Sequence, residues 1–230
     1  IPVEQLDGTI RWCTFPWIRG TSGVYYNKTK LEKYLGANYV MPKTSDEFLK
    51  TLAELKEKLP SNDAPLAYVA GAQYVITSPT VMFAQYEGVD GYNRFWSGIN
   101  EDGEYSSDNF KMTGRLRALQ TLEDYVGVEE GYTHSASLTN SFMQLQTKWI
   151  TGKAGVFTFA GDWIENEMRD IRTNQVISAI SHPVISSIVE KCNVVKTDEQ
   201  LSFIIGCVDD NKDYESSKAA YSEKFSASLS

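Results

Sequence analysis

Short apolar runs alternate with amphipathic segments along most of this 230-residue chain, and that alternation limits the fold more than any other feature of the sequence. A short apolar run is typical of a strand inside a covered sheet, whereas apolar side chains at helical spacing are typical of a helix that packs on one. The pattern therefore predicts an α/β fold. Strands are expected over residues 10–15, 23–26, 66–70, 155–160 and 175–180.

The clearest helix is expected over residues 44–59. Thr44 and Glu47 have the spacing of a capping box, in which each side chain accepts a hydrogen bond from the backbone amide of the other residue. Pro60 ends the segment, because proline cannot continue a helix. The apolar stripe of this helix consists of Phe48, Leu52, Leu55 and Leu59.

Two more helices are expected from their apolar stripes. The stripe of residues 109–126 consists of Met112, Leu116, Leu119, Leu122 and Val126. The stripe of residues 137–150, which Ser137 caps and Gly152 ends, consists of Leu138, Phe142, Leu145 and Trp149. Shorter or weaker helices are expected over residues 28–35, 80–86, 184–191, 197–205 and 213–225, and one is expected to begin at Asp162 with a second capping-box pattern.

Composition excludes several kinds of partner. The net charge is −8 and the isoelectric point is about 4.9, so a nucleic-acid backbone would be repelled. No apolar run approaches the roughly 18 residues that a membrane-spanning helix needs. The chain starts at Ile1-Pro2 without a methionine, a basic segment or an apolar segment. We therefore expect that it begins downstream of its own targeting sequence.

The cysteines and histidines predict no metal site. Cys13, Cys192 and Cys207 lack Cys-x-x-Cys spacing and are interpreted as separate buried thiols, although a disulfide between Cys192 and Cys207 stays open. His134 and His182 stand outside any cluster with the spacing of metal ligands. The sequence also contains no glycine motif for phosphate or dinucleotide binding and no nucleophile elbow. No cofactor is expected.

Four motifs, in a fixed order, resemble those of the family 1 extracellular solute-binding proteins. Together they cover roughly residues 7–185, and Ser45 departs from the family pattern, which usually has tryptophan there. The motifs are Asp7-Gly8-Thr9-Ile10 through Phe15-Pro16, Gly23-Val24-Tyr25-Tyr26-Asn27-Lys28, Pro42-Lys43-Thr44-Ser45-Asp46-Glu47-Phe48, and Gly152-Lys153-Ala154-Gly155-Val156-Phe157 followed by Gly161-Asp162-Trp163.

The resemblance implies a periplasmic-binding-protein-like (type II) fold, in which two α/β lobes joined by hinge strands close on a ligand. Residues 1–18 would supply a hinge strand and the end of lobe one, and residues 19–230 would form lobe two, with a less regular tail over 183–230. The resemblance also implies a monosaccharide or oligosaccharide ligand and the permease of an ABC importer as partner. The protein would be an extracellular lipoprotein of a Gram-positive bacterium or a periplasmic protein. We expect a monomer that reaches the membrane only through a lipid anchor upstream of this sequence.

Sugar-binding residues are expected at the carboxyl ends of the strands, where α/β sheets leave a crevice. Trp163 follows a strand, lies in the first turn of a helix and matches the family's stacking tryptophan. Gly161 and Asp162 accompany it, and Asp162 has a helix N-cap as its alternative role. Tyr74 and Gln73 are expected to offer a second ring and a hydroxyl partner from the loop after residue 70.

Three more site residues are expected where the hinge meets the crevice: Trp17, Arg19 and Thr21. Two other tryptophans, Trp96 and Trp149, are expected to pack inside the lobe. Two alternatives stay open. One is a glycoside hydrolase that uses Asp162 and Glu165, although both residues also fit capping. The other is a fragment without activity of its own. We expect a binding protein and not an enzyme.

Overall fold

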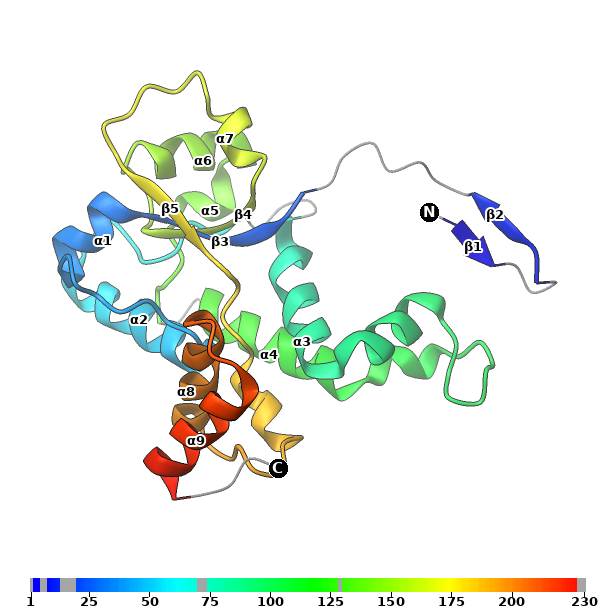
Figure 1. Cartoon of the computed structure of the whole chain (residues 1–230). Coiled ribbons are helices and arrows are strands. Elements are labelled where there is room, and N and C mark those ends of the chain that lie inside the picture. Colours follow the sequence, from blue (N-terminus) through cyan, green and yellow to red (C-terminus); the bar gives the residue numbers. More distant parts are fainter. Residues whose placement is uncertain (1, 5–7, 13–19, 70–73, 128–129, 227–230) are drawn as a thin grey trace.

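The computed structural model describes residues 2–4, 8–12, 20–69, 74–127 and 130–226. Both helices and strands are present in these ranges, as the sequence predicts (Figure 1). The strands are β1 (Pro2–Glu4), β2 (Ile10–Trp12), β3 (Ser22–Asn27), β4 (Phe157–Gly161) and β5 (Ile177–Ile180). The helices are α1 (Lys28–Leu35), α2 (Ser45–Lys58), α3 (Tyr74–Ser97), α4 (Thr113–Val126), α5 (Ala136–Thr139), α6 (Phe142–Ile150), α7 (Ile164–Glu167), α8 (Asp198–Asp209) and α9 (Tyr214–Phe225), with 3-10 turns η1 (Ser107–Lys111) and η2 (Ser186–Glu190).

The central sheet has the order β4-β3-β5, and β3 is antiparallel to both neighbours. Ser22 pairs with Gly161, and Val24 pairs with Ile180. The start of β3 therefore lies beside the ends of β4 and β5, and we name this end of the sheet the Trp163 end. At the opposite end β3 passes directly into α1. The strands β1 and β2 form a separate two-stranded pair, drawn apart from the central sheet in Figure 1.

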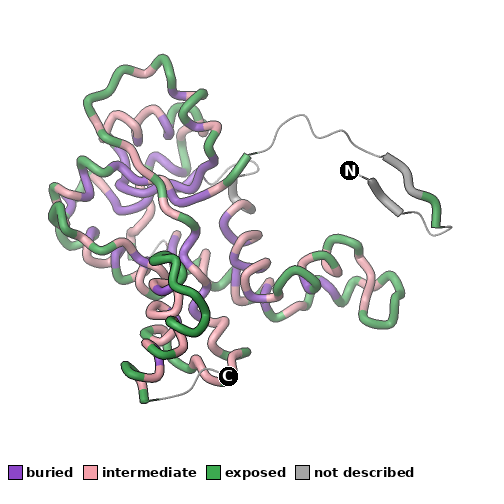
Figure 2. The backbone as a smooth tube through the Cα atoms, viewed as in Figure 1, coloured by how far each residue is buried: buried purple, intermediate pink, exposed green. Residues whose placement is uncertain are grey.

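Helices cover both faces of the central sheet, and the buried residues gather between these layers (Figure 2). On one face, β3 and β4 pack against α2, α3 and α4. The fully buried side chains of that layer include Val24, Phe48, Leu52, Met82 and Phe157. On the other face α6 and α7 pack against a second cluster, which includes Leu145, Trp149, Ala160 and Ile164. Removing these apolar surfaces from water stabilises the three-layer arrangement.

The capping box of α2 is only half formed. Thr44 Oγ1 accepts a hydrogen bond from Glu47 N at 3.2 Å, as predicted. The Glu47 carboxylate instead accepts from Lys43 N at 2.7 Å, one residue earlier than predicted. The difference follows from tertiary pairing, because Thr44 forms a parallel bridge with Val184 and its hydroxyl donates to Asp198. The start of α2 is thus tied to the segment after β5.

The expected strand over residues 66–70 is wrong in part. Leu66 forms isolated parallel bridges with Thr133 and Phe157, and Ala67 N donates to Phe157 O at 2.8 Å. The pairing stops after Ala67, because Tyr68 N donates to the hydroxyl of Ser137 at 3.2 Å, so the segment forms single bridges and not a continuous ladder. It still runs in the same direction as β4, and residue 70 lies outside the described ranges.

The predicted apolar stripe of α4 is wrong in part, because Met112, Leu122 and Val126 pack against the core as expected but the other two residues do not. Leu116 and Leu119 are 55% and 46% exposed, whereas Ala118 and Tyr125 are buried. The helix turns its small residues inward because it lies very close to α3. A Cβ atom on Gly114 would lie 2.8 Å from Tyr86 Cδ1, closer than side chains pack.

The helix expected over residues 137–150 is divided in two. A new helix starts after Ser141, which forms a full capping box with Gln144, and Leu138 is 79% exposed. Trp149 is buried as expected, and its Nε1 donates to Val156 O at 3.0 Å. Trp96 is not buried as expected: it is 60% exposed at the end of α3.

The other helices differ in how closely they match the expected bounds. The helix over residues 28–35 has the predicted bounds, whereas α3 begins earlier and ends later than the expected residues 80–86. Cys192 and Cys207 are free thiols. Within the ranges given above, none of the helices is long and apolar enough to span a lipid bilayer. In the same ranges, no three His, Cys, Asp or Glu side chains gather as a metal site would require.

Candidate functional site

The Trp163 end of the sheet joins the residues after β4 to those before β3. Asp162 N donates to Thr21 O at 3.0 Å, so the strand pairing continues beyond Gly161. The Asp162 carboxylate in turn accepts hydrogen bonds from Thr21 N at 3.2 Å and from Thr21 Oγ1 at 3.4 Å. The structure thus brings together two predicted site residues that are far apart in the sequence.

Asp162 does not cap a helix. α7 begins only at Ile164, its N-cap is Trp163, and no side chain caps it. The predicted capping box of Asp162 and Glu165 is therefore wrong, because the carboxylate of Asp162 turns back to the strand that precedes β3. Both carboxylates are exposed.

Trp163 is half-buried and packs against glycine backbone. A Cβ atom on Gly161 would lie 2.1 Å from Trp163 Cζ3, and one on Gly20 would lie 3.3 Å from the same atom. At Gly161 only hydrogen leaves room for the indole, whereas at Gly20 a larger side chain would make a tight contact. The ring also packs against the cluster under α6 and α7, and part of its surface stays open to solvent.

Tyr25 is a residue of this site that the sequence analysis did not identify. It lies on β3, between the buried Val24 and Tyr26, and its side chain packs on the opposite face, against the same cluster as Trp163. Burial raises the pKa of the Tyr25 phenol above its ordinary value of 10.0, and the charges of Asp162 and Glu165 raise it further. The alternation of side chains along β3 could have indicated that Tyr25 faces away from its neighbours.

The other predicted site residues are only partly described. Tyr74 is the first residue of α3. The segment from Leu66 runs parallel to β4 and therefore leads toward the Trp163 end, and α3 packs against β4. Gln73, Trp17 and Arg19 lie outside the described residues. Thr21, Gly161, Asp162 and Trp163 are the predicted residues that the structure brings together.

Solved structures of binding proteins share this fold. A chitin oligosaccharide binding protein superposes with a TM-score of 0.57 and 22% sequence identity, over 79% of this chain and 42% of that protein. A sugar transporter from Bacillus licheniformis, solved with stachyose, gives a TM-score of 0.56 at 18% identity, over 79% and 44% of the two chains. A family 1 extracellular solute-binding protein from Bifidobacterium longum subsp. infantis gives 0.54 at 19%, over 80% and 44%.

These similarities define the class of the protein as a periplasmic-binding-protein-like (type II) fold, of which the chain spans less than half the length found in the solved structures. The sequence pattern of the bacterial extracellular solute-binding proteins matches residues 3–183. The chain therefore belongs to that family, as its motifs predict. The family and its structural neighbours named above are binding proteins and not enzymes. No curated protein matches the sequence.

Proposed function

We propose that this chain is the carbohydrate-binding component of an ABC importer, and that Trp163 stacks on the sugar. The observation that carries the proposal is a half-buried indole over glycine backbone with hydrogen-bonding groups beside it. Sugars bind to proteins through two kinds of contact: an aromatic ring covers the C–H face of the sugar, and polar groups bond its hydroxyls. The names of two structural neighbours, which mention chitin oligosaccharide and stachyose, support an oligosaccharide ligand.

The groups beside Trp163 have complementary hydrogen-bonding roles. A carboxylate has about four lone-pair positions. Among the described residues, Thr21 bonds only one oxygen of Asp162, which leaves the other to accept from sugar hydroxyls. Tyr25 keeps its phenolic proton at neutral pH, because burial and two nearby carboxylates oppose its ionisation. It can therefore donate. Tyr74, Gln73, Trp17 and Arg19 remain candidate contacts from the neighbouring segments.

The proposed mechanism is closure of two lobes on the ligand. Residues 19–230 would form lobe two, and residues 1–18 would supply a hinge strand and the end of lobe one. A sugar that contacts both lobes binds the closed state better and shifts the equilibrium toward it. One lobe alone offers half of the contacts, so the 230-residue chain should bind sugar weakly. The closed protein would deliver its ligand to a membrane permease from the cell surface or the periplasm, as a monomer held by a lipid anchor.

Nothing in the geometry favours the hydrolase that Asp162 and Glu165 would form. One oxygen of Asp162 is already engaged with Thr21, and the proposed role of the site is binding without bond cleavage. Incubation with aryl glycosides tests this point, and no turnover above buffer is expected. Release of the aryl group that Asp162→Ala abolishes would contradict a pure binding function.

Calorimetric titration of the chain with a panel of millimolar oligosaccharides tests the proposal directly. We expect at least one sugar to bind, and Trp163→Ala to weaken its binding by more than tenfold. Trp96→Ala is the matched control, because Trp96 is an exposed tryptophan on α3 that the proposal does not use. The proposal fails if no sugar in the panel binds, or if Trp163→Ala binds as well as Trp96→Ala.

A further inference from the structure

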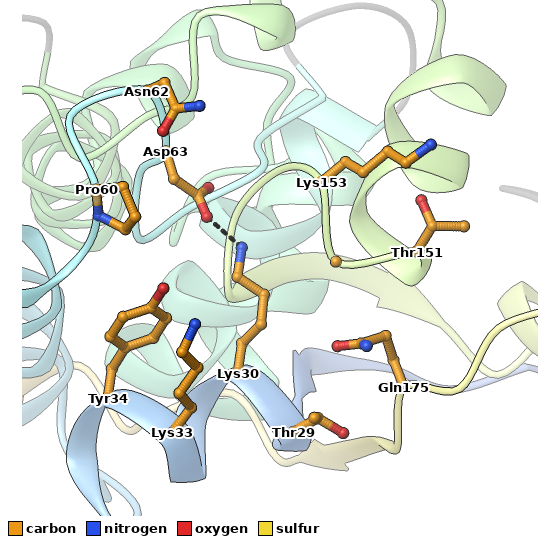
Figure 3. Close-up of a pocket in the computed structure, with 11 residues that line it drawn as sticks. Thr29, Lys30, Lys33, Tyr34, Pro60, Asn62, Asp63, Thr151, Lys153 and Gln175 are labelled. Atoms are coloured by element: carbon orange, nitrogen blue, oxygen red, sulfur yellow. Dashed lines mark hydrogen bonds and ion pairs between the residues drawn. The ribbon is translucent and has the colours of Figure 1, made fainter.

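A cavity lies at the end of the sheet opposite Trp163. Its volume is about 530 Å³, within the range of small-molecule sites. It opens where β3 passes into α1 and where the chain enters β4. Figure 3 shows Lys30 and Lys33 rising from α1 toward Asn62 and Asp63 on the facing loop, and Lys153 lines the cavity from the loop before β4. We call it the lysine cavity and define it by these five residues.

Lys30 and Asp63 neutralise one another within this cavity. Lys30 is only 7% exposed, and its ammonium forms an ion pair with Asp63 and donates to Gly155 O at 2.9 Å. The second oxygen of Asp63 accepts from Ala64 N and from Gly155 N, each at 2.9 Å. The carboxylate is therefore satisfied by one cation and two backbone amides, and it cannot balance a second lysine.

The other two lysines leave the cavity positively charged. In the part of the chain that the structure describes, neither Lys33 nor Lys153 forms an ion pair, and both are exposed. The ammonium of Lys33 lies 4.8 Å from the ring centroid of Tyr34, a contact that holds the charge without cancelling it. Three lysines and one aspartate line the cavity, so its net charge is +2 in a chain of −8.

We propose that the lysine cavity binds a small molecule that bears a carboxylate or phosphate group. Lysine ammonium groups bind such anions as point charges. The third N–H of Lys30 is not used by Asp63 or Gly155, and the exposed side chains of Lys33 and Lys153 can turn their ammonium groups to a ligand. Uncharged partners for the rest of a ligand are Asn62 and Gln175. This site is independent of the sugar site, because the two lie at opposite ends of the sheet.

The experiment is a calorimetric titration of the Trp163→Ala variant, which removes the proposed sugar site, with inorganic phosphate, D-glucuronate and D-glucose. We expect phosphate, glucuronate or both to bind, glucose not to bind, and the affinity to fall as salt is added. Binding of phosphate alone or glucuronate alone identifies the anionic group, and binding of both identifies a general anion site.

The decisive variant is Lys33→Gln with Lys153→Gln, which leaves the buried Lys30–Asp63 pair intact. It should weaken anion binding by at least tenfold. The matched control is Lys28→Gln with Lys58→Gln, which removes two exposed lysines outside the cavity and should change the affinity by less than twofold. The proposal is overturned if neither anion binds, if glucose binds as well as glucuronate, or if both double variants bind alike. Failure of sugar binding at Trp163 would leave this result unaffected.

Discussion

Trp163 lies so close to the backbone of Gly161 that a Cβ atom on Gly161 would be 2.1 Å from the indole ring. Gly161→Ala should therefore displace the indole ring of Trp163, because the added methyl group and the ring cannot occupy the same space. We expect the free energy of unfolding to fall by about 1–3 kcal/mol, as for other overpacked sites. Sugar affinity should fall by more than tenfold. Urea unfolding and calorimetry measure the two effects.

Gly206→Ala is the control for this substitution. Gly206 lies inside α8, and its added Cβ atom would meet only the flexible side chain of Lys43 at 3.4 Å. Alanine is the better helix former by about 0.5–1 kcal/mol. This variant should keep or gain stability and bind sugar normally. Equal behaviour of the two variants would show that Gly161 does not position Trp163.

The carboxylate of Asp162 should matter more for binding than for folding. Asp162→Ala removes the acceptor of Thr21 N and Thr21 Oγ1, both at an exposed site, so the stability loss should be about 1 kcal/mol or less. The proposed contact to a sugar hydroxyl is lost as well, and affinity should fall about tenfold. Asp170→Ala is the matched control, because Asp170 is an exposed carboxylate just beyond α7. If Asp162→Ala binds sugar with wild-type affinity, Asp162 does not contact the ligand.

The orientation of α4 predicts opposite sensitivities at two of its positions. Ala118 is 1% exposed and Leu116 is 55% exposed. Ala118→Leu should lower the free energy of unfolding by about 1–3 kcal/mol through overpacking. Leu116→Ser should change it by about 0.5 kcal/mol or less, as for other surface sites. Denaturant unfolding followed by circular dichroism measures both changes. A larger loss of stability in Leu116→Ser than in Ala118→Leu would indicate that Leu116 faces the core, as the sequence predicts.

Local signals account for the parts of the fold that were predicted. The apolar periodicity of β3, and the caps and helix-ending residues of α1 and α2, all lie within or next to these segments. Their observed bounds differ from the expected ones by only a residue or so. α4 was misread because hydrophobicity does not identify the small Gly114 as a contact. That role appears only when Tyr86 of α3 is placed against it.

The sequence analysis named residue types that meet at one end of the sheet, and it was less informative about their contacts. The motif around Trp163 predicts a site at the end where Thr21, Gly161 and Asp162 also lie. The partner of Asp162 is Thr21, which is 141 positions away, and no local pattern relates the two. The helix cap expected for Asp162 was inferred from its neighbours in the sequence, whereas its hydrogen bonds are to a residue that is distant in the sequence. Tyr25 was missed because two adjacent tyrosines face opposite sides of one strand.

His182 should make the stability of the protein depend on pH. It is 7% exposed, it stacks on Phe159 at a centroid distance of 5.9 Å, and burial lowers its pKa from 6.5 to about 4. The unfolded chain takes up a proton near pH 6.5, whereas the folded chain does so only near pH 4. The contribution of His182 to the free energy of unfolding is therefore complete above pH 6.5 and is lost as the pH falls toward 4. At about 1.4 kcal/mol for each pKa unit, the loss approaches about 3 kcal/mol.

The variant His182→Gln isolates this contribution from the carboxylates that titrate in the same window. The wild-type free energy of unfolding, measured in urea from pH 7 to pH 4, should fall more steeply than that of His182→Gln. His134→Gln is the control. Burial also lowers the pKa of His134, but its Nδ1 already accepts from Ala136 N, and its side chain is less enclosed. The free energy of unfolding of His134→Gln should therefore depend on pH more nearly as that of the wild type does. If His182→Gln has the wild-type slope, the imidazole of His182 must be as accessible to protons in the folded protein as in the unfolded chain.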